Sequence, residues 1–223
     1  MVVNNDTELN DIHNFNINPK TREVFLHSCL DGDEEGGVDY RSAVVFEKNI
    51  RYLNTLSDES ILVHMHLPGG DWQDCLGIYD TIRFSKAKII ILAYAKVESS
   101  SSVILQAAPL RILMPNTNVM IHYGSFSVDA EHSKAAAAGI QWNEQECDKM
   151  IDIFTDRCMQ SEMAKLKNWK RMMAKKHITS QLANKCDWIL KAQEAVEYGF
   201  ADGVLGDKKY STIDSLKSYK FKK

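Results

Sequence analysis

The sequence lacks any segment typical of export or of a membrane anchor. Its start, MVVNNDTELNDIHNFNINPK, has no cationic stretch followed by an apolar core, so we expect no secretory signal. No later apolar run is long enough to span a bilayer. The formal net charge of −3 over 223 residues gives no reason to expect nucleic acid or an anionic membrane as a partner. These absences predict a cytoplasmic protein.

Cysteine is scarce and unpaired. The chain has five cysteines, an odd number with no C-x-x-C pair, which indicates reduced thiols and neither a disulfide framework nor a zinc site. The segment HMH at 64–66 puts two histidines on one face of a predicted strand, but no third ligand is near, so we expect no metal there. The cysteines are Cys29, Cys75, Cys147, Cys158 and Cys186.

Strand and helix patterns alternate from residue 23 to residue 122. This alternation predicts βαβ units and a mostly parallel sheet, and the continuous apolar run at 88–95 is typical of a strand buried on both faces. Strands are predicted at 23–30, 61–67, 88–95, 111–114 and 119–122. Helices are predicted at 40–56, from Asp71 onward, and in SSVILQAA before Pro109.

The rest of the chain has a different pattern. Residues 129–176 carry apolar residues at helical spacing among many charges, which predicts one long helix or two, projecting from or packed on the core. A further helix, KAQEAVEYG, ends at Gly199, a plausible C-cap. We expect a flexible arm at 1–20, a single domain at 21–208, and a basic, solvated tail at 209–223.

Three predicted loops at the carboxyl ends of strands carry groups suited to catalysis. In α/β sheets, ligands meet such loops. Pro-Gly-Gly at 68–70 lets backbone N–H groups approach a substrate carbonyl. The serine run 99–102 lies at a helix start, where peptide dipoles favour negative charge, and His122 could accept a proton. A carboxylate would have to orient His122, and spacing cannot select it from 30 acidic residues. The residues alone therefore indicate a serine hydrolase but do not complete its site.

Four motifs in order resemble one family. They are LPGGDWQDCLGIYDTIRF, SSSSVILQAA, ILMPNTNVMIH and CDWILKAQEAVEYGFADGVL. Over about residues 22–206 this succession resembles ClpP, the proteolytic subunit of Clp proteases. The resemblance implies an α/β fold of the ClpP/crotonase type, with stacked βαβ units, a mostly parallel sheet and a projecting long-helix region, called the handle.

The resemblance also implies the site residues. Ser99 would be the nucleophile, His122 the general base, and Asp187 the carboxylate that orients the histidine. Gly69 and Gly70, with the backbone N–H of Ser100, would form the oxyanion hole. The site needs no metal and no cofactor. The implied activity is a serine-type endopeptidase acting on polypeptides.

The resemblance implies partners as well. The expected assembly is a homo-oligomer of two stacked rings joined through the long-helix region. An AAA+ unfoldase would feed it, since this chain has no G-x-x-x-x-G-K-[ST] loop. Two alternatives stay open: a stand-alone maturation protease of the phage type, and a catalytically impaired structural subunit, suggested by Glu98 next to the serine. Crotonase-type acyl-CoA enzymes share the scaffold, but the Ser, His and Asp motifs argue against them.

Overall fold

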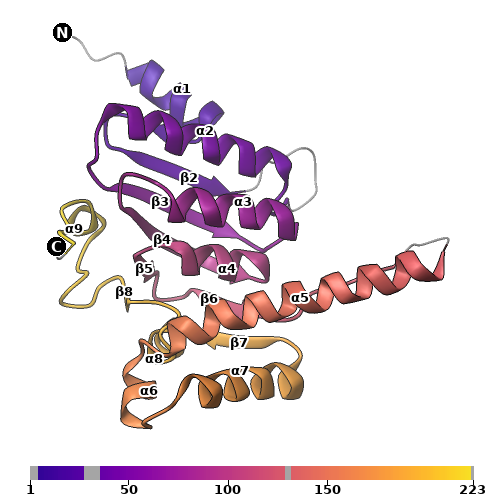
Figure 1. The fold of residues 1–223 in the computed structure, drawn as a ribbon. Coiled ribbons are helices and arrows are strands. Elements are labelled where there is room, and N and C mark those ends of the chain that lie inside the picture. The colour runs from indigo at the N-terminus through magenta and orange to yellow at the C-terminus, as the bar shows by residue number, and fades with distance from the viewer. Residues whose placement is uncertain (1–4, 28–35, 129–131, 222–223) are drawn as a thin grey trace.

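The computed structural model describes residues 5–27, 36–128 and 132–221 (Figure 1). Its helices are α1 (Asn5–Phe15), α2 (Tyr40–Leu56), α3 (Trp72–Arg83), α4 (Ser100–Ala107), α5 (Ser133–Cys158), α6 (Glu162–Leu166), α7 (Arg171–Lys185), α8 (Ala192–Glu197) and α9 (Ile213–Lys217). Its strands are β1 (Ile17–Asn18), β2 (Glu23–His27), β3 (Ile61–Leu67), β4 (Ile89–Glu98), β5 (Leu110–Leu113), β6 (Asn118–Ile121), β7 (Trp188–Lys191) and β8 (Gly203–Val204).

The strands of the described residues form one mostly parallel sheet, as the alternation predicted. Its main order is β1-β2-β3-β4-β5-β8, with β6 paired to β4 and β7 paired to β6. Strand β4 changes partner along its length: Ile90–Ala93 pair with β5, whereas Lys96–Glu98 pair with β6. Ala95, between the two stretches, has a φ of 43°. This change of partner brings the end of β6 beside the end of β4.

Each face of the sheet has its own core. Successive strand residues point to opposite faces, so Ile89 and Ile91 join the larger core, while Ile90 and Leu92 join a smaller one behind it. Helices α2, α3 and α4 stack in chain order over the larger core (Figure 1). The predicted strand at 88–95 is thus buried on both faces, and the structure extends it to Glu98.

The long-helix region contains three helices where one or two were predicted. Helix α5 projects away from the sheet at its amino-terminal end, and α6 and α7 fold back beneath its other end (Figure 1). The break comes after Cys158, and Ser161 then caps α6 by accepting the N–H of Ala164 at 3.1 Å. Helix α7 continues to Lys185, beyond the predicted limit at 176. The short strands β7 and β8 were not predicted.

A flexible arm was expected at 1–20, but the described part of this segment, residues 5–20, contains regular secondary structure. Helix α1 and strand β1 occupy it, and β1 pairs with β2 in an antiparallel manner. Side-chain amides fasten the segment: Asn18 donates to Glu8 at 2.8 Å, and Asn49 of α2 donates to the carbonyl of Phe15 at 2.7 Å. Polar composition concealed this order, because the anchoring groups are themselves polar.

The carboxyl-terminal segment is not the solvated tail that was predicted. Leu216 of α9 is fully buried, and Tyr219 and Phe221 pack partly buried against the smaller core. Lys217 pairs with Glu23 of β2 at 3.0 Å. The segment covers the second face of the sheet, which would otherwise leave apolar strand residues in water.

The end of the first predicted strand, residues 28–30 with Cys29, lies outside the described residues. Cysteines 75, 147, 158 and 186 carry free thiols. Within the described residues, no helix combines the length and apolarity that crossing a membrane requires.

Candidate active site

Ser99 occupies a sharp turn between β4 and α4. Its φ of 56° and ψ of −130° are unfavourable for a residue with a side chain, and such strain occurs where a site holds one residue in a fixed pose. Its backbone N–H donates to the carbonyl of Met120 on β6 at 2.9 Å. The strand before and the helix after therefore fix the direction in which the Ser99 hydroxyl projects.

The other serines of the run have different surroundings. The Ser101 hydroxyl lies 2.8 Å from the carbonyl of Leu67 and 2.7 Å from that of Glu98, so it ties β3 to β4. The Ser102 hydroxyl donates to the carbonyl of Ser99 at 2.6 Å. The Ser100 hydroxyl is buried with no hydrogen-bond partner among the described residues. Of the four serines, Ser99 and Ser100 line a cavity at this edge of the sheet.

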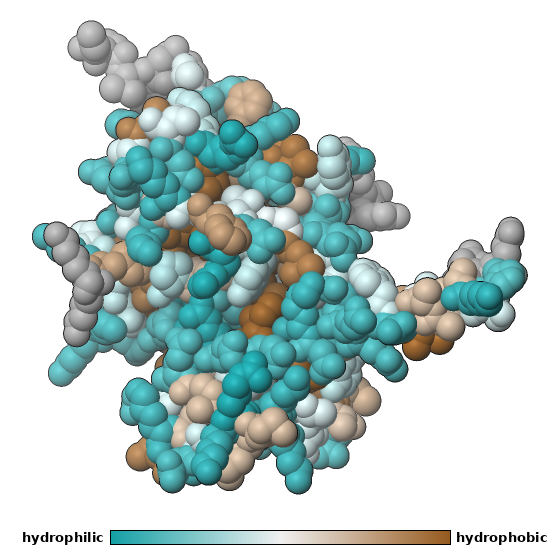
Figure 2. Space-filling model, viewed as in Figure 1, coloured by the Kyte–Doolittle hydropathy of each residue, from teal (hydrophilic) through white to brown (hydrophobic). Residues whose placement is uncertain are grey.

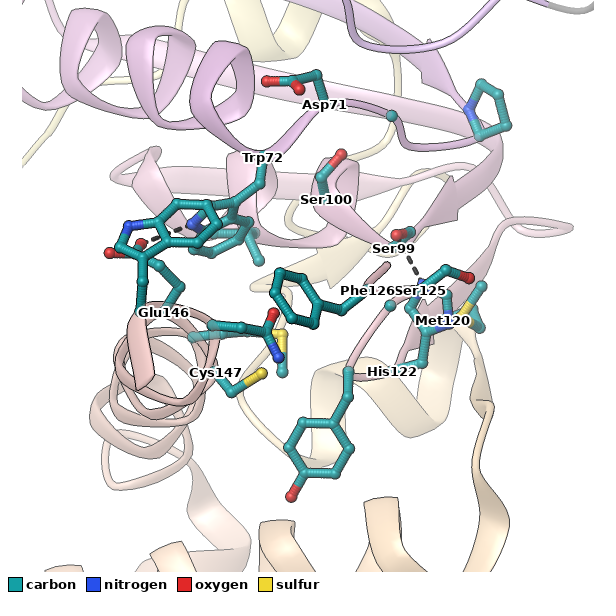
Figure 3. A pocket seen from close by; sticks show the side chains of 18 residues that line it. Asp71, Trp72, Ser99, Ser100, Met120, His122, Ser125, Phe126, Glu146 and Cys147 are labelled. Atoms are coloured by element: carbon teal, nitrogen blue, oxygen red, sulfur yellow. Dashed lines mark hydrogen bonds between the residues drawn. The ribbon is translucent and has the colours of Figure 1, made fainter. Parts of the chain in front are cut away.

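Sheet register brings Ser99, His122 and Asp187 together. In the parallel pair, Glu98 lies opposite Met120; in the antiparallel pair, Ile121 lies opposite Trp188. Ser99 directly follows Glu98, His122 directly follows Ile121, and Asp187 directly precedes Trp188, so all three fall at the same edge of the sheet. His122 Nε2 lies 2.7 Å from Ser99 Oγ, and His122 Nδ1 lies 3.1 Å from Asp187 Oδ1 (Figure 3 shows the first contact).

Asp187 is exposed, and the residue after it is buried. The Asp187 side chain is 62% exposed, whereas Trp188 is 1% exposed. The Trp188 ring meets Tyr198 edge-on at 4.9 Å between centroids and Phe200 at 5.8 Å. Aromatic pairs of this kind fix a ring firmly, so Trp188 holds the backbone that carries the carboxylate.

The Pro-Gly-Gly loop packs against the serine turn. A Cβ placed on Gly69 would lie 2.6 Å from Ser99 Cβ, and Gly69 has a φ of 108°. The loop also pairs with Val38: the Val38 N–H donates to the Gly69 carbonyl at 2.6 Å, and the Asp71 N–H donates to the Val38 carbonyl at 2.7 Å. Because neighbouring peptide groups alternate in direction along extended backbone, the N–H of the intervening Gly70 points away from Val38.

A cavity of about 550 Å³ opens beside Ser99 and His122. Its wall combines the Pro-Gly-Gly loop, the serine turn, the segment after β6 and one side of α5 (Figure 3). Glu98 is not among its lining residues. The lining residues are Pro68, Gly70, Asp71, Trp72, Ser99, Ser100, Val103, Met120, His122, Tyr123, Gly124, Ser125, Phe126, Trp142, Asn143, Glu146, Cys147 and Met150.

The part of the cavity wall that comes from α5 was not predicted from the sequence. The Trp72 indole N–H donates to Glu146 Oε2 at 2.6 Å, across 74 positions of sequence. Trp72 follows the Pro-Gly-Gly-Asp motif directly, and that proximity was a usable signal. Glu146 had none, since it is one of many acidic residues on a charged helix.

Of the two histidines at 64–66, His64 belongs to another network and His66 is exposed. His64 Nδ1 lies 2.8 Å from the Tyr94 hydroxyl, and His64 Nε2 lies 3.1 Å from Glu23 Oε1. Burial lowers the pKa of His64, against the opposing effect of Glu23. In the described part of the chain, no group of three or more His, Cys, Asp or Glu residues could hold a metal ion.

The fold and the Ser–His–Asp arrangement are together those of a serine hydrolase. Comparison with known proteins gives the family. A family model described as Clp protease matches residues 34–208. The chain therefore belongs to the Clp protease family, as the four motifs predicted, and as a member it is a serine peptidase.

Individual relatives agree with this assignment. The chain is 26% identical over 200 residues to the ATP-dependent Clp protease proteolytic subunit 2 of Pseudomonas aeruginosa, covering 87% of this chain and 86% of that protein. It is 27% identical to proteolytic subunit 1 of Rhodococcus jostii, covering 69% of this chain and 64% of that protein. A ClpP1 mutant from Listeria monocytogenes has a similar fold, with a TM-score of 0.67, 18% identity, and coverage of 89% and 96% of the two chains.

Proposed function

We propose that this protein is a serine-type endopeptidase with Ser99 as nucleophile, His122 as general base and Asp187 as the orienting carboxylate. The observation that carries the proposal is the pair of contacts at His122, 2.7 Å to Ser99 and 3.1 Å to Asp187. A histidine held between a hydroxyl and a carboxylate can take the hydroxyl proton while the carboxylate stabilises the charged imidazole.

The reaction has two halves. Ser99 Oγ attacks the peptide carbonyl carbon as its proton moves to His122 Nε2, which gives a tetrahedral intermediate. The C–N bond then breaks, and the leaving amine takes the proton from His122. A water molecule attacks the acyl-enzyme, gives its proton to His122, and releases the peptide acid as Ser99 regains its proton.

We propose the Gly69–Gly70 loop and the backbone N–H of Ser100 as the oxyanion hole. Two observations support this. The Gly70 N–H points away from Val38. The Ser100 N–H is the first of α4, and a first N–H has no hydrogen-bond partner within its own helix. Gly70 and Ser100 both line the cavity beside Ser99. Gly69 contributes by its close approach to Ser99. Fixed N–H donors aimed at a developing oxyanion stabilise the transition state.

We further propose a cytoplasmic homo-oligomer of two stacked rings, with the active sites inside. Helix α5 and the segment after β6 expose apolar side chains, which a monomer would leave in water. Figure 2 shows brown and tan side chains on the projecting end of α5, against a mostly teal surface. Val128 and Ile140 are exposed and do not line the cavity, whereas Tyr123, Phe126 and Trp142 are exposed and also line it.

We propose that an AAA+ unfoldase delivers unfolded polypeptides to this chamber. The names of the relatives, ATP-dependent Clp protease subunits, support this partner. The stand-alone maturation protease would degrade its substrate equally well with and without an ATPase. An impaired subunit is disfavoured because Glu98, the residue that suggested it, is not among the residues that line the cavity.

Labelling with a fluorophosphonate, followed by mass spectrometry of the modified peptide, tests the proposal. We expect one adduct, on Ser99, that is lost in Ser99→Ala and kept in Ser100→Ala. Ser100→Ala is the matched control because the Ser100 hydroxyl has no hydrogen bond to lose. Absence of any adduct in folded wild-type protein would contradict the proposal.

A further inference from the structure

The cavity wall contributed by α5 carries a carboxylate. Glu146 lines the cavity, its side chain is 15% exposed, and its Oε2 accepts the indole N–H of Trp72 at 2.6 Å. Figure 3 shows this pair at one side of the pocket and the Ser99–His122 contact at the other. A substrate bound to Ser99 thus has a carboxylate across the pocket from its reacting carbonyl.

Glu146 keeps its negative charge in this setting. Burial acts to raise the pKa of Glu146, but hydrogen bonds from Trp72 and Lys149 outweigh it and leave the pKa below its ordinary value. Asp71 also lines the cavity, but its carboxylate already accepts two backbone N–H groups at the start of α3. Of the described residues that line the cavity, none is lysine or arginine.

Part of the cavity wall is apolar. Val103, Phe126 and Met150 belong to the lining, and the Phe126 ring is drawn between the Ser99 side and the Glu146 side in Figure 3. Such a wall suits the methylene stem of a long side chain. Lysine and arginine bury their stems on apolar surface and keep their charged ends at polar groups.

We infer that Glu146 makes this pocket selective for peptides with a lysine or arginine beside the scissile bond, and makes it reject aspartate and glutamate. This inference rests on the proposed peptidase function and specifies its substrate class. The stem of the substrate side chain packs on the apolar wall, and its cationic end forms a charge-assisted hydrogen bond with the Glu146 carboxylate. An acidic side chain would bring like charges together in a partly dry site.

Lys149 is the internal competitor for the same carboxylate. Its Nζ lies 3.0 Å from both oxygens of Glu146, but the Lys149 side chain is 50% exposed. Solvent around the half-exposed Lys149 weakens this ion pair. A substrate cation can therefore share or replace the contact, and removal of Lys149 should strengthen the selectivity.

The test uses three fluorogenic peptides that differ in the residue before the scissile bond: lysine, norleucine or glutamate. In wild type we expect kcat/KM to fall in the order lysine, norleucine, glutamate. In Glu146→Gln the lysine-to-norleucine ratio should fall about tenfold, the scale of one charge-assisted hydrogen bond in a binding site. In Lys149→Gln the ratio should rise.

Glu144→Gln is the matched control. Glu144 is an exposed acid on the same helix that does not line the cavity, so its removal should leave the ratio unchanged. Cleavage of the norleucine peptide by each variant reports that it is folded. An unchanged ratio in Glu146→Gln, with peptides cleaved and Ser99 labelled, would overturn this inference and leave the peptidase function standing. No cleavage and no label in wild type would overturn both.

Discussion

Gly69 shows how one missing side chain permits the contact on which the site depends. A Cβ on Gly69 would lie 2.6 Å from Ser99 Cβ and 2.8 Å from the Glu98 carbonyl oxygen. Two constraints therefore coincide at one residue: a φ that favours glycine and a lack of space. Neither is visible in the sequence, where Pro-Gly-Gly indicates only a loop whose backbone can approach a substrate.

We expect Gly69→Ala to lower kcat/KM for peptides by about 100-fold, because a small displacement of a nucleophile costs that much. Gly206→Ala is the control: Gly206 has a similar φ of 102°, but a Cβ there would meet nothing within 4 Å. Both variants should lose some thermal stability from the φ strain, and Gly206→Ala should keep its activity. Equal activity losses in the two would show that the packing against Ser99 is unimportant.

Among the elements, those with a strong local pattern could be predicted from sequence. Helices α2, α3 and α4 and strands β3 to β6 came from apolar periodicity or from a continuous apolar run. Strand β7 has four residues and owes its position to pairing with β6, about 70 residues away in sequence, which no local pattern encodes. Asp187 lies at the start of this pairing, so residues alone could not select it, and the family resemblance did.

Helix α9 was missed for a related reason. Its five residues are too few to show a period, and its stability comes from tertiary contacts. Leu216 packs on the second face of the sheet, and Lys217 reaches Glu23, which in turn contacts His64. A lysine-rich ending looks solvated in sequence, but here Leu216 is buried and Lys217 is paired.

The His64 network should make stability depend on pH. Burial lowers the pKa of His64 in the folded state from its ordinary value of 6.5, so the unfolded chain takes up a proton first as the pH falls. Stability contributed by neutral His64 is then present above about pH 6.5 and is lost below it. The pKa of Glu23, also lowered, adds a further loss at more acidic pH.

Melting temperatures measured at about pH 7.5 and about pH 5.5 check this. We expect wild type to melt lower at the acidic pH, and His64→Gln to show a smaller difference between the two. His66→Gln, an exposed histidine two residues along the same strand, serves as the control and should behave as wild type. A pH difference that His64→Gln leaves intact would assign the effect to other groups.

The projecting end of α5 exposes apolar side chains that a single chain, by itself, would leave in water. Helix α5 extends well beyond the sheet (Figures 1 and 2). Ile140 on this helix is 49% exposed. Apolar residues on a protruding helix are typical of a surface that another subunit covers. The proposed stacking of two rings would bury this surface.

Ile140→Glu should therefore separate the rings. We expect native mass spectrometry to show the wild-type assembly at twice the mass of the variant assembly, because a buried carboxylate in an apolar interface is strongly unfavourable. Gln141→Glu adds the same charge at the neighbouring exposed position and should leave the assembly intact. Identical assembly masses for wild type and Ile140→Glu would rule out α5 as the ring-to-ring contact.

The role of Ser99 as nucleophile is best tested by the turnover of a fluorogenic peptide by wild type and Ser99→Ala, purified side by side with matched assembly states. Removal of the Ser99 hydroxyl leaves the fold and the cavity in place but removes the attacking atom. We predict a loss of kcat of at least about 10³-fold, as for other serine hydrolases that lose their nucleophile. Hydrolysis by Ser99→Ala at a rate near that of wild type would rule out Ser99 as the nucleophile.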